Sequence, residues 1–321
     1  MGRYLLRRLG FALLLVFVVS SAALLLTRLA PGDFTTTDPS LDPAIRARIR
    51  AELGLDRSPA AQYFSWLGGA VRFDFGRSLL YSRPVGALVS ERALNTAVLA
   101  TVALVFATAI GIPIGIYSGS RTRGFGRAMV RAFSVLGISM PPLIGSLALV
   151  FLAARTGWLP VGGMTSAAGL EMTWTAWLAD LARHIPVPAL ALAIPLAASL
   201  ERLQSQAIAS AAREPFVAAS QARGLERTQA LLRHAWPVSL RPVLGLYGVM
   251  IASLFSGSFV VEVVTSWPGL GRLMFDALKA RDLFLVAGCA ATGAVFLACG
   301  TLIADLLLAW TDPRVGSGER A

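Results

Sequence analysis

Charged residues are scarce in this 321-residue chain, at 15% of the total, against about a quarter in an ordinary soluble domain. Lysine is almost missing, and Lys279 is its single occurrence. The phosphate-binding loop GxxxxGK[ST] needs a lysine after a glycine-rich turn, and Lys279 lacks that context. We therefore expect no ATP hydrolysis by this chain, and the sequence shows no nucleophile–base constellation for another enzyme activity.

Cysteine and histidine are equally rare, with two residues of each. Cys289 and Cys299 lie ten residues apart in one apolar stretch, where a helix turns them to different sides and keeps them from pairing. No zinc or redox spacing exists. His184 and His234 are predicted in different compartments and cannot form one site, and Glu201, Glu262 and Asp305 have no second carboxylate or histidine at ligand spacing. We therefore expect no metal site and no cofactor bound by this chain.

Positive charge is the one plentiful ionic feature, with a formal net charge of +11. A nucleic-acid-binding protein would gather it into a basic stripe on a soluble fold. Here the arginines stand between long apolar blocks, as the positive-inside rule describes for membrane proteins. We therefore expect a bilayer and not nucleic acid as the surrounding partner.

Hydrophobic residues make up 55% of the chain and come in six long stretches. About 20 helical residues cross the apolar core of a bilayer, and backbone groups in lipid must pair within the segment. We therefore predict an all-α, polytopic membrane protein with six transmembrane helices. The first stretch follows three arginines, as in a signal peptide, but it is longer than such a run and five more follow. The predicted spans are Leu9–Thr27, Ala93–Ser120, Ala132–Ala154, Ile185–Leu200, Pro242–Val261 and Leu283–Ala304.

Arginines also predict the orientation. The N-terminal tail, residues 121–131, residues 201–241 and the C-terminal tail together carry 15 arginines. The short segments 155–184 and 265–282 carry two and three basic residues. Because short cytoplasmic loops are enriched in arginine, we predict that both termini are cytoplasmic.

The segment 31–92 is then external. Asp42-Pro43 is a good helix start, because an acidic cap precedes a proline at the first turn. Trp66, Phe73 and Phe75 follow, and they suit either packing on the helix bundle or docking of a partner. The chain thus divides into residues 1–30, with the N-terminal tail and first span, 31–92, and 93–321, with the remaining five spans.

The cytoplasmic segment 201–241 contains a helix too short to cross a membrane. Glu214-Pro215 favours a helix start and Gly224 a helix end. A second short helix is predicted from Glu226 to His234, ending near Trp236-Pro237. Two interpretations of these helices stay open, namely docking into a groove of a cytoplasmic partner and lying at the lipid interface.

Three carboxylates, Glu201, Glu262 and Asp305, lie at or near the ends of predicted spans. A carboxylate there is costly and indicates either a paired structural anchor or a substrate contact. Pro141-Pro142 interrupts the third span. A kink there suits a transport pathway or ordinary bundle packing equally well.

One motif in this segment resembles a known family. Ala218-Ala219-Ser220, three further residues and Gly224, and then His234-Ala235-Trp236-Pro237, resemble the coupling loop of ABC-importer permeases. The usual motif has Glu-Ala-Ala at the first three positions, so this chain departs from it there. The coupling-loop residues that the resemblance implies are Glu214, Pro215, Phe216, Ala218, Ala219, Ser220, Arg223, Gly224, His234 and Pro237.

The resemblance extends over nearly the whole chain and is to DppB/OppB-type peptide permeases. The motifs that carry it are, in order, Arg3-Tyr4-Leu5-Leu6-Arg7-Arg8-Leu9, Leu29-Ala30-Pro31-Gly32-Asp33, Leu53-Gly54-Leu55-Asp56, Asp74-Phe75-Gly76-Arg77-Ser78, Ser139-Met140-Pro141, Gly157-Trp158-Leu159-Pro160, Gly257-Ser258-Phe259-Val260-Val261-Glu262, Trp267-Pro268-Gly269-Leu270-Gly271, Arg281-Asp282 and Asp312-Pro313-Arg314. One such motif would carry little weight, whereas this many in order are specific.

This resemblance implies the type I ABC importer permease fold in a prokaryotic inner or plasma membrane. It also implies three kinds of partner: a second homologous permease, two ATP-binding subunits that hold ATP and Mg, and an external substrate-binding protein. The expected substrates are di- or oligopeptides. Nickel or another small solute carried by the same type of permease is the alternative. A self-sufficient secondary carrier would favour an inverted repeat, and we see none. Candidates for the translocation path are Ser139, Met140, Pro141, Ser258 and Glu262.

Overall fold

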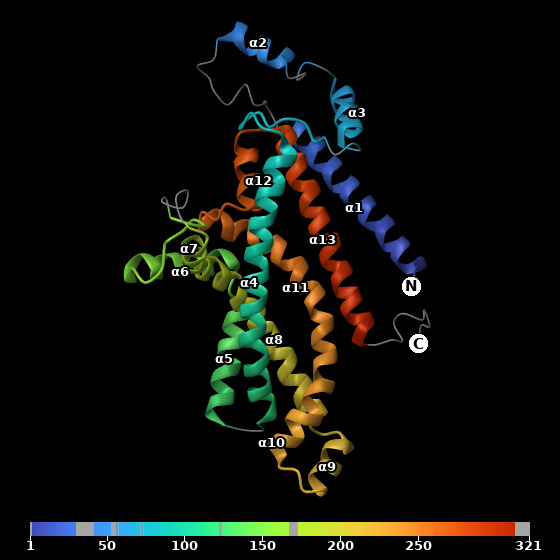
Figure 1. The fold of residues 1–321 in the computed structure, drawn as a ribbon, viewed down its shortest axis with the longest axis vertical. Coiled ribbons are helices and arrows are strands. Elements are labelled where there is room, and N and C mark those ends of the chain that lie inside the picture. The colour runs from blue at the N-terminus through green and yellow to red at the C-terminus, as the bar shows by residue number, and fades with distance from the viewer. Residues whose placement is uncertain are drawn as a thin grey trace. The chain divides into compact units, whose positions relative to one another are not determined.

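A computed structural model describes residues 2–29, 42–52, 56, 58–70, 72, 74–121, 124–166 and 173–311. These residues form an all-α protein, as predicted, with one isolated β-bridge between Arg77 and Pro84. Figure 1 labels the helices along the chain. They are α1 (Gly2–Leu29), α2 (Pro43–Glu52), α3 (Pro59–Ala70), α4 (Val85–Ser120), α5 (Phe125–Ser139), α6 (Pro142–Thr156), α7 (Trp174–His184), α8 (Pro186–Ala211), α9 (Pro215–Ala222), α10 (Arg227–Ala230), the π-helical turn η3 (Leu231–Ala235), α11 (Trp236–Val264), α12 (Leu270–Lys279) and α13 (Leu283–Thr311).

Five of the described helices are long and apolar enough to cross a bilayer, and the bent pair α5 and α6 makes six if it counts as one span. The five lie in α1, α4, α8, the continuous run from α10 to α11, and α13. Large apolar side chains remain exposed on α1 and α5, including Phe11 at 65% and Phe133 at 65%. Exposed apolar surface of this kind is what lipid covers.

The third predicted span is two helices and not one. α5 and α6 meet at an angle of 108° around Met140 and Pro141. Both residues have extended backbone, with ψ of 111° and 141°. Each of them precedes a proline, and the proline ring excludes the helical region for the residue before it. Two consecutive prolines therefore stop α5 and start α6 in a new direction.

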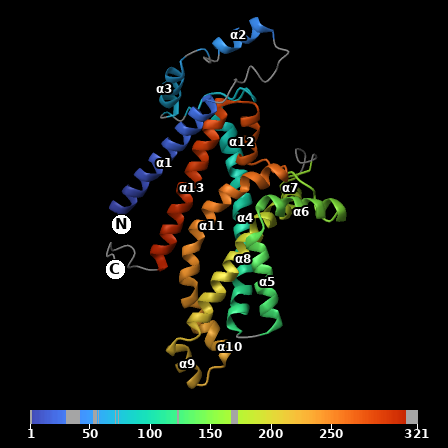
Figure 2. The ribbon, with the colours of Figure 1, turned by 180° about the vertical axis from the view of Figure 1, so that it is seen from behind.

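The chain forms two compact units. The first consists of residues 98–267 and the end of α13 from Cys299. In this unit α8 packs against α5, α6, α7 and α11, and both ribbon views show α8 between α5 and α11 (Figures 1 and 2). α4 also approaches α8 closely, because a Cβ on Gly119 would lie 2.3 Å from the Ser205 carbonyl oxygen. Small residues allow such close contact between apolar helices.

The second unit consists of residues 2–97 and 268–298. Asp42 starts α2 as predicted, since its Oδ1 accepts a hydrogen bond of 2.8 Å from the Ala44 amide. Trp66 is 6% exposed and packs with Leu24, Leu283 and Ala287 in an apolar cluster. Of the two interpretations of the aromatic residues in segment 31–92, packing is therefore correct for Trp66, while Phe73 lies outside the described residues.

A buried carboxylate, Asp282, holds this second unit together. Its Oδ2 accepts hydrogen bonds from the Ser78 hydroxyl at 2.6 Å and from the amides of Leu79 and Leu80 at 2.7 and 3.0 Å. Its Oδ1 accepts one from the Leu285 amide at 3.2 Å, which caps the start of α13. Asp282 thus fixes the loop before α4 against the loop before α13.

Candidate functional site

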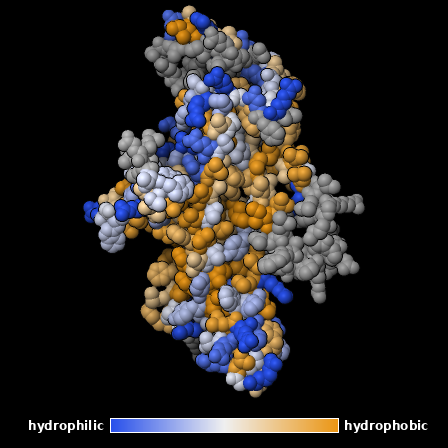
Figure 3. Space-filling view, in the orientation of Figure 1, coloured by the Kyte–Doolittle hydropathy of each residue, from blue (hydrophilic) through white to orange (hydrophobic). Residues whose placement is uncertain are grey.

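Residues 212–235, which we call the coupling segment, connect α8 to α11 and contain α9, α10 and η3. The ribbon views show them at one end of the first unit, beyond the ends of both long helices (Figures 1 and 2). In the space-filling view hydrophilic side chains gather around this end, and apolar side chains predominate over the helices that lead to it (Figure 3). The segment is therefore a polar projection from an apolar bundle.

The short helix α9 begins and ends where the sequence predicted. Glu214 has extended backbone, and Pro215 occupies the first turn, where its missing N–H costs nothing. At the other end Gly224 has a φ of +95°. The Gly224 amide donates to the Gln221 carbonyl at 2.9 Å, and the Leu225 amide to that of Ser220 at 3.3 Å. This pair of bonds is the Schellman arrangement, in which glycine takes the left-handed position.

One face of α9 is buried in the coupling segment itself. Val217 is 2% exposed and Ser220 is fully buried. The Ser220 hydroxyl donates to the Val217 carbonyl at 2.7 Å. The side chain of this predicted site residue is therefore hydrogen-bonded within α9. Val217 belongs to an apolar cluster whose other buried members are Ile208, Ala211, Ala230, Leu231 and Ala235. The cluster joins α9 to the end of α8 and to η3.

The opposite face of α9 is exposed. Phe216 is 40% exposed, and Ala218, Ala219 and Arg223 are exposed beside it. Because the two alanine side chains are small, the exposed face of α9 is nearly flat, and the Phe216 side chain projects from it. A partner could approach the backbone of α9 closely there, which is the geometry that a docking helix needs.

The second short helix does not end near Trp236-Pro237. α10 passes into η3, and η3 passes directly into α11. The π-helical turn gives the Trp236 amide a bond to the Leu231 carbonyl, and Pro237 then falls in the first turn of α11, where no N–H is required. His234 is half-buried, while Pro237 is exposed.

Sequence reasoning missed three exposed apolar side chains near this turn. Leu232 is 46%, Trp236 is 36% and Val238 is 39% exposed. They lie among arginines in a segment predicted to be cytoplasmic. Apolar residues within such a basic segment were the sequence signal that could have identified them. They are further exposed apolar side chains on η3 and the first turn of α11.

The candidate path residues fall into two groups. Ser139, Met140 and Pro141 form the break between α5 and α6. Ser258 is 2% exposed and Glu262 is fully buried, both on α11. Sequence neighbours of the two groups approach each other, because a Cβ on Gly257 would lie 3.8 Å from Cγ of Pro142. The break between α5 and α6 therefore lies against the part of α11 that carries Ser258.

Glu201 is a structural anchor between three helices. It lies on α8, is 6% exposed, and accepts hydrogen bonds from the hydroxyls of Ser118 on α4 and Ser134 on α5. The described part of Asp305 is its helical backbone alone. Within the described residues no three His, Cys, Asp or Glu side chains come together as a metal site.

Comparison with known proteins completes the description of the site. Residues 111–317 match the family model described as "Binding-protein-dependent transport system inner membrane component", and residues 1–108 match its N-terminal model. The coupling segment falls inside the first match. The chain is 30% identical to the oligopeptide transport system permease protein AppB of Bacillus subtilis, over 98% of this chain and 99% of that protein.

Two further relatives match to the same extent. A putative peptide permease protein of Brucella ovis is 30% identical over 98% of this chain and 99% of its own length. A probable peptide ABC transporter permease protein of Sinorhizobium fredii is likewise 30% identical over 98% of this chain and 99% of its own. The similarity therefore covers both compact units and the coupling segment.

Proposed function

The chain belongs to the family of binding-protein-dependent transport system inner membrane components, and on that premise we propose that it is a permease subunit that imports di- or oligopeptides with energy from ATP. The full-length similarity to proteins named as peptide and oligopeptide permeases carries this proposal. The proposed complex contains a second homologous permease, two ATP-binding subunits that hold ATP and Mg, and an external substrate-binding protein.

In the proposed orientation both termini and the coupling segment lie in the cytoplasm. The concentration of arginines in residues 121–131 and 201–241 supports it. Residues 31–92 then face outward and help to dock the substrate-binding protein. The break between α5 and α6 and the neighbouring part of α11 would line the path of the peptide.

The coupling segment receives force from an ATP-binding subunit in this proposal. The exposed face of α9 would enter a groove on that subunit, with Phe216 as its apolar anchor. The opposite face shares an apolar cluster with the end of α8 and with η3, and η3 is continuous with α11. A push on α9 would therefore move two membrane helices together.

Ala219→Arg tests this docking directly. Ala219 is exposed, so the variant should fold, but a long charged side chain would obstruct the groove. In the reconstituted importer we expect uptake of a labelled peptide, and the ATP hydrolysis that peptide stimulates, to fall by at least about tenfold, the equivalent of 1.4 kcal/mol. Ala182→Arg is the matched control, since Ala182 is also an exposed helical alanine, on α7. Unchanged uptake by Ala219→Arg would contradict the coupling role.

Gly224 offers a second test that depends on backbone conformation. Apart from Gly224 and its two chain neighbours, no residue has an atom within 4 Å of the position of a Cβ there, yet the φ of +95° strains most side chains. Gly224→Arg should uncouple ATP hydrolysis from transport and leave membrane insertion intact. Gly224→Asn should retain more coupling, because asparagine tolerates positive φ better than arginine does. Equal uptake by both variants and the wild type would exclude a requirement for this turn.

The substrate is tested through the cognate substrate-binding protein. Native mass spectrometry of that protein, purified from cells, should detect bound peptides. Bound nickel without peptide would contradict the peptide proposal and would leave the permease proposal untouched.

A further inference from the structure

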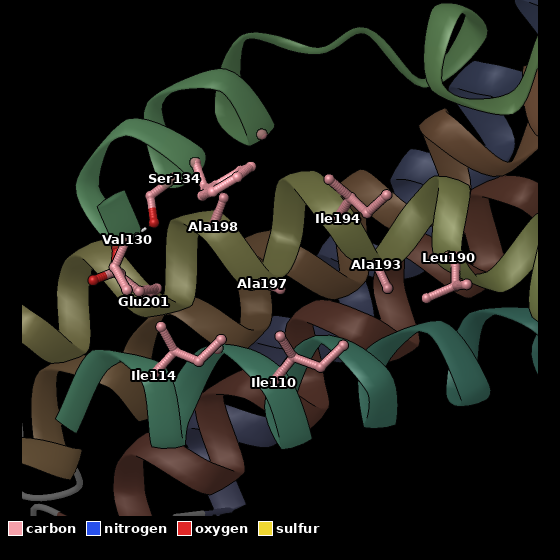
Figure 4. A pocket seen from close by; sticks show the side chains of 13 residues that line it. Ile110, Ile114, Val130, Ser134, Leu190, Ala193, Ile194, Ala197, Ala198 and Glu201 are labelled. Carbon is pink, nitrogen blue, oxygen red and sulfur yellow. Dashed lines mark hydrogen bonds between the residues drawn. The ribbon is translucent and has the colours of Figure 1, made fainter. Parts of the chain in front are cut away.

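An apolar cavity of about 280 Å³ lies between α4, α5 and α8 in the first unit. It exists because α8 presents the small residues Ala193, Ala197 and Ala198 opposite Ile110 and Ile114 of α4 (Figure 4). Almost all of its wall is aliphatic. Its polar lining consists of Ser134 and Glu201, whose hydrogen bond closes one end (Figure 4).

A second cavity of about 250 Å³ begins at that end. It shares Ser134 and Glu201 with the first, and apart from Val135 its other lining residues are polar or charged. Arg127 and Arg131 reach it from α5 and Arg202 from α8. Three arginines and one glutamate line it, and Glu201 already accepts hydrogen bonds from two serine hydroxyls. The second cavity is therefore electropositive.

We propose that the two cavities together bind one anionic phospholipid, with an acyl chain in the apolar cavity and the phosphate among Arg127, Arg131 and Arg202. Guanidinium groups bind phosphate oxygens in pairs of charge-assisted hydrogen bonds. Saturated and unsaturated acyl chains both suit an aliphatic wall, which makes few demands beyond shape. A phospholipid requires an apolar cavity next to a basic one, whereas a soluble anion requires only the basic cavity.

The place of the arginines along the helices favours a lipid of the bilayer. α5 begins at Phe125, so Arg127 and Arg131 lie within about 10 Å of its start. Farther along α5, Phe133 and Leu136 are 65% and 63% exposed, as expected for residues in contact with lipid tails. The phosphate would thus lie at the boundary of the membrane, where basic residues attract anionic lipid, and the chain would point into its apolar core. This site requires only that the chain is embedded in a membrane, and it is independent of the peptide substrate.

Native mass spectrometry of the purified importer in mild detergent tests the proposal. The probes are phosphatidylglycerol, phosphatidylcholine with the same acyl chains, and inorganic phosphate. We expect wild type to retain phosphatidylglycerol in preference to phosphatidylcholine. R127Q/R131Q/R202Q should weaken that retention by on the order of fivefold for each arginine removed. R155Q/R183Q/R241Q is the matched control, because it removes the same charge at three exposed positions outside both cavities.

A second variant tests the acyl chain separately. Ile114 lines the apolar cavity and is 38% exposed, so Ile114→Trp can fill the cavity without entering the core. We expect it to reduce phosphatidylglycerol retention while the thermal stability of the importer is unchanged. Equal retention of the two lipids by wild type, or equal loss in the two triple variants, would overturn the proposal. Binding of inorganic phosphate as tight as that of phosphatidylglycerol would overturn it too, since the apolar cavity would then contribute nothing.

Discussion

Two buried carboxylates, Asp282 in one compact unit and Glu201 in the other, are used differently. Asp282, in the second unit, accepts hydrogen bonds from three backbone amides and one hydroxyl. Glu201, in the first unit, accepts from two serine hydroxyls on neighbouring helices. Asp282 therefore satisfies loop backbone that has no helical partner, whereas Glu201 joins helices whose backbone is already paired. The first determines the course of the chain, and the second determines the spacing of helices beside two cavities.

Removing Asp282 should have the largest effect of the changes that test this comparison. Asp282→Ala leaves the amides of Leu79, Leu80 and Leu285 buried or half-buried without their acceptor. We expect the importer to lose on the order of 4 kcal/mol of stability, because each donor left unsatisfied costs about 1–3 kcal/mol. Thermal unfolding in detergent measures it. Asp282→Asn keeps one acceptor oxygen and should lose less. An unchanged melting temperature in Asp282→Ala would show that water replaces the carboxylate.

Glu201→Gln should have a smaller effect. The amide keeps one acceptor oxygen and the same shape, so one of the two serine hydroxyls must find another partner. The Ser118 hydroxyl already lies 3.3 Å from the Gly115 carbonyl, and it can turn fully toward it. We expect a loss of about 1–2 kcal/mol, measured by the same unfolding experiment. A loss as large as that of Asp282→Ala would remove the distinction between the two carboxylates.

Asp180 on α7 should show the smallest effect, because its carboxylate lies near the surface. The Ser166 amide donates to its Oδ2 at 2.6 Å, and this bond holds the pKa of Asp180 below its ordinary value of 3.8. A lowered pKa means that the contact stabilises the protein above pH 3.8 and is lost as the pH falls through the lowered value. Asp180→Asn should therefore speed hydrogen exchange in residues 157–166 at pH 7. The ratio of exchange rates, variant over wild type, should fall toward one below the lowered pKa. A ratio that does not change with pH would contradict this role for the carboxylate.

Local patterns predicted the helix ends well where a residue determines the backbone conformation by itself. Glu214-Pro215 and Gly224 delimit α9 because proline and glycine restrict or free the backbone whatever surrounds them. Proline misled the prediction at a position where the neighbouring backbone changes the hydrogen-bond pattern. Pro237 was expected to end a helix, but the π-helical turn before it shifts the hydrogen bonds and the helix continues. Pro195, by contrast, was placed inside the fourth predicted span, and it lies inside α8.

Side-chain direction was harder to predict than helix position. Ser220 is part of the motif that resembles a coupling loop, yet it is fully buried and bonds its own helix. Phe216, in the same motif, is exposed. Only the cluster around Val217 decides which face of α9 turns inward. The three apolar side chains at Leu232, Trp236 and Val238 were missed for the same reason, since exposure depends on packing and not on residue type.

The membrane-embedded, helical character of this protein was determined by its sequence alone. Apolar stretches of about 20 residues have the length of a helix that crosses the bilayer, and a helix pairs its backbone amides within its own segment, as lipid requires. The tertiary structure alone decided the partners of Asp282 and Glu201 and the cavities beside Glu201. These features arise from contacts between residues that are far apart in the chain. The sequence of one segment does not indicate which other segment packs against it.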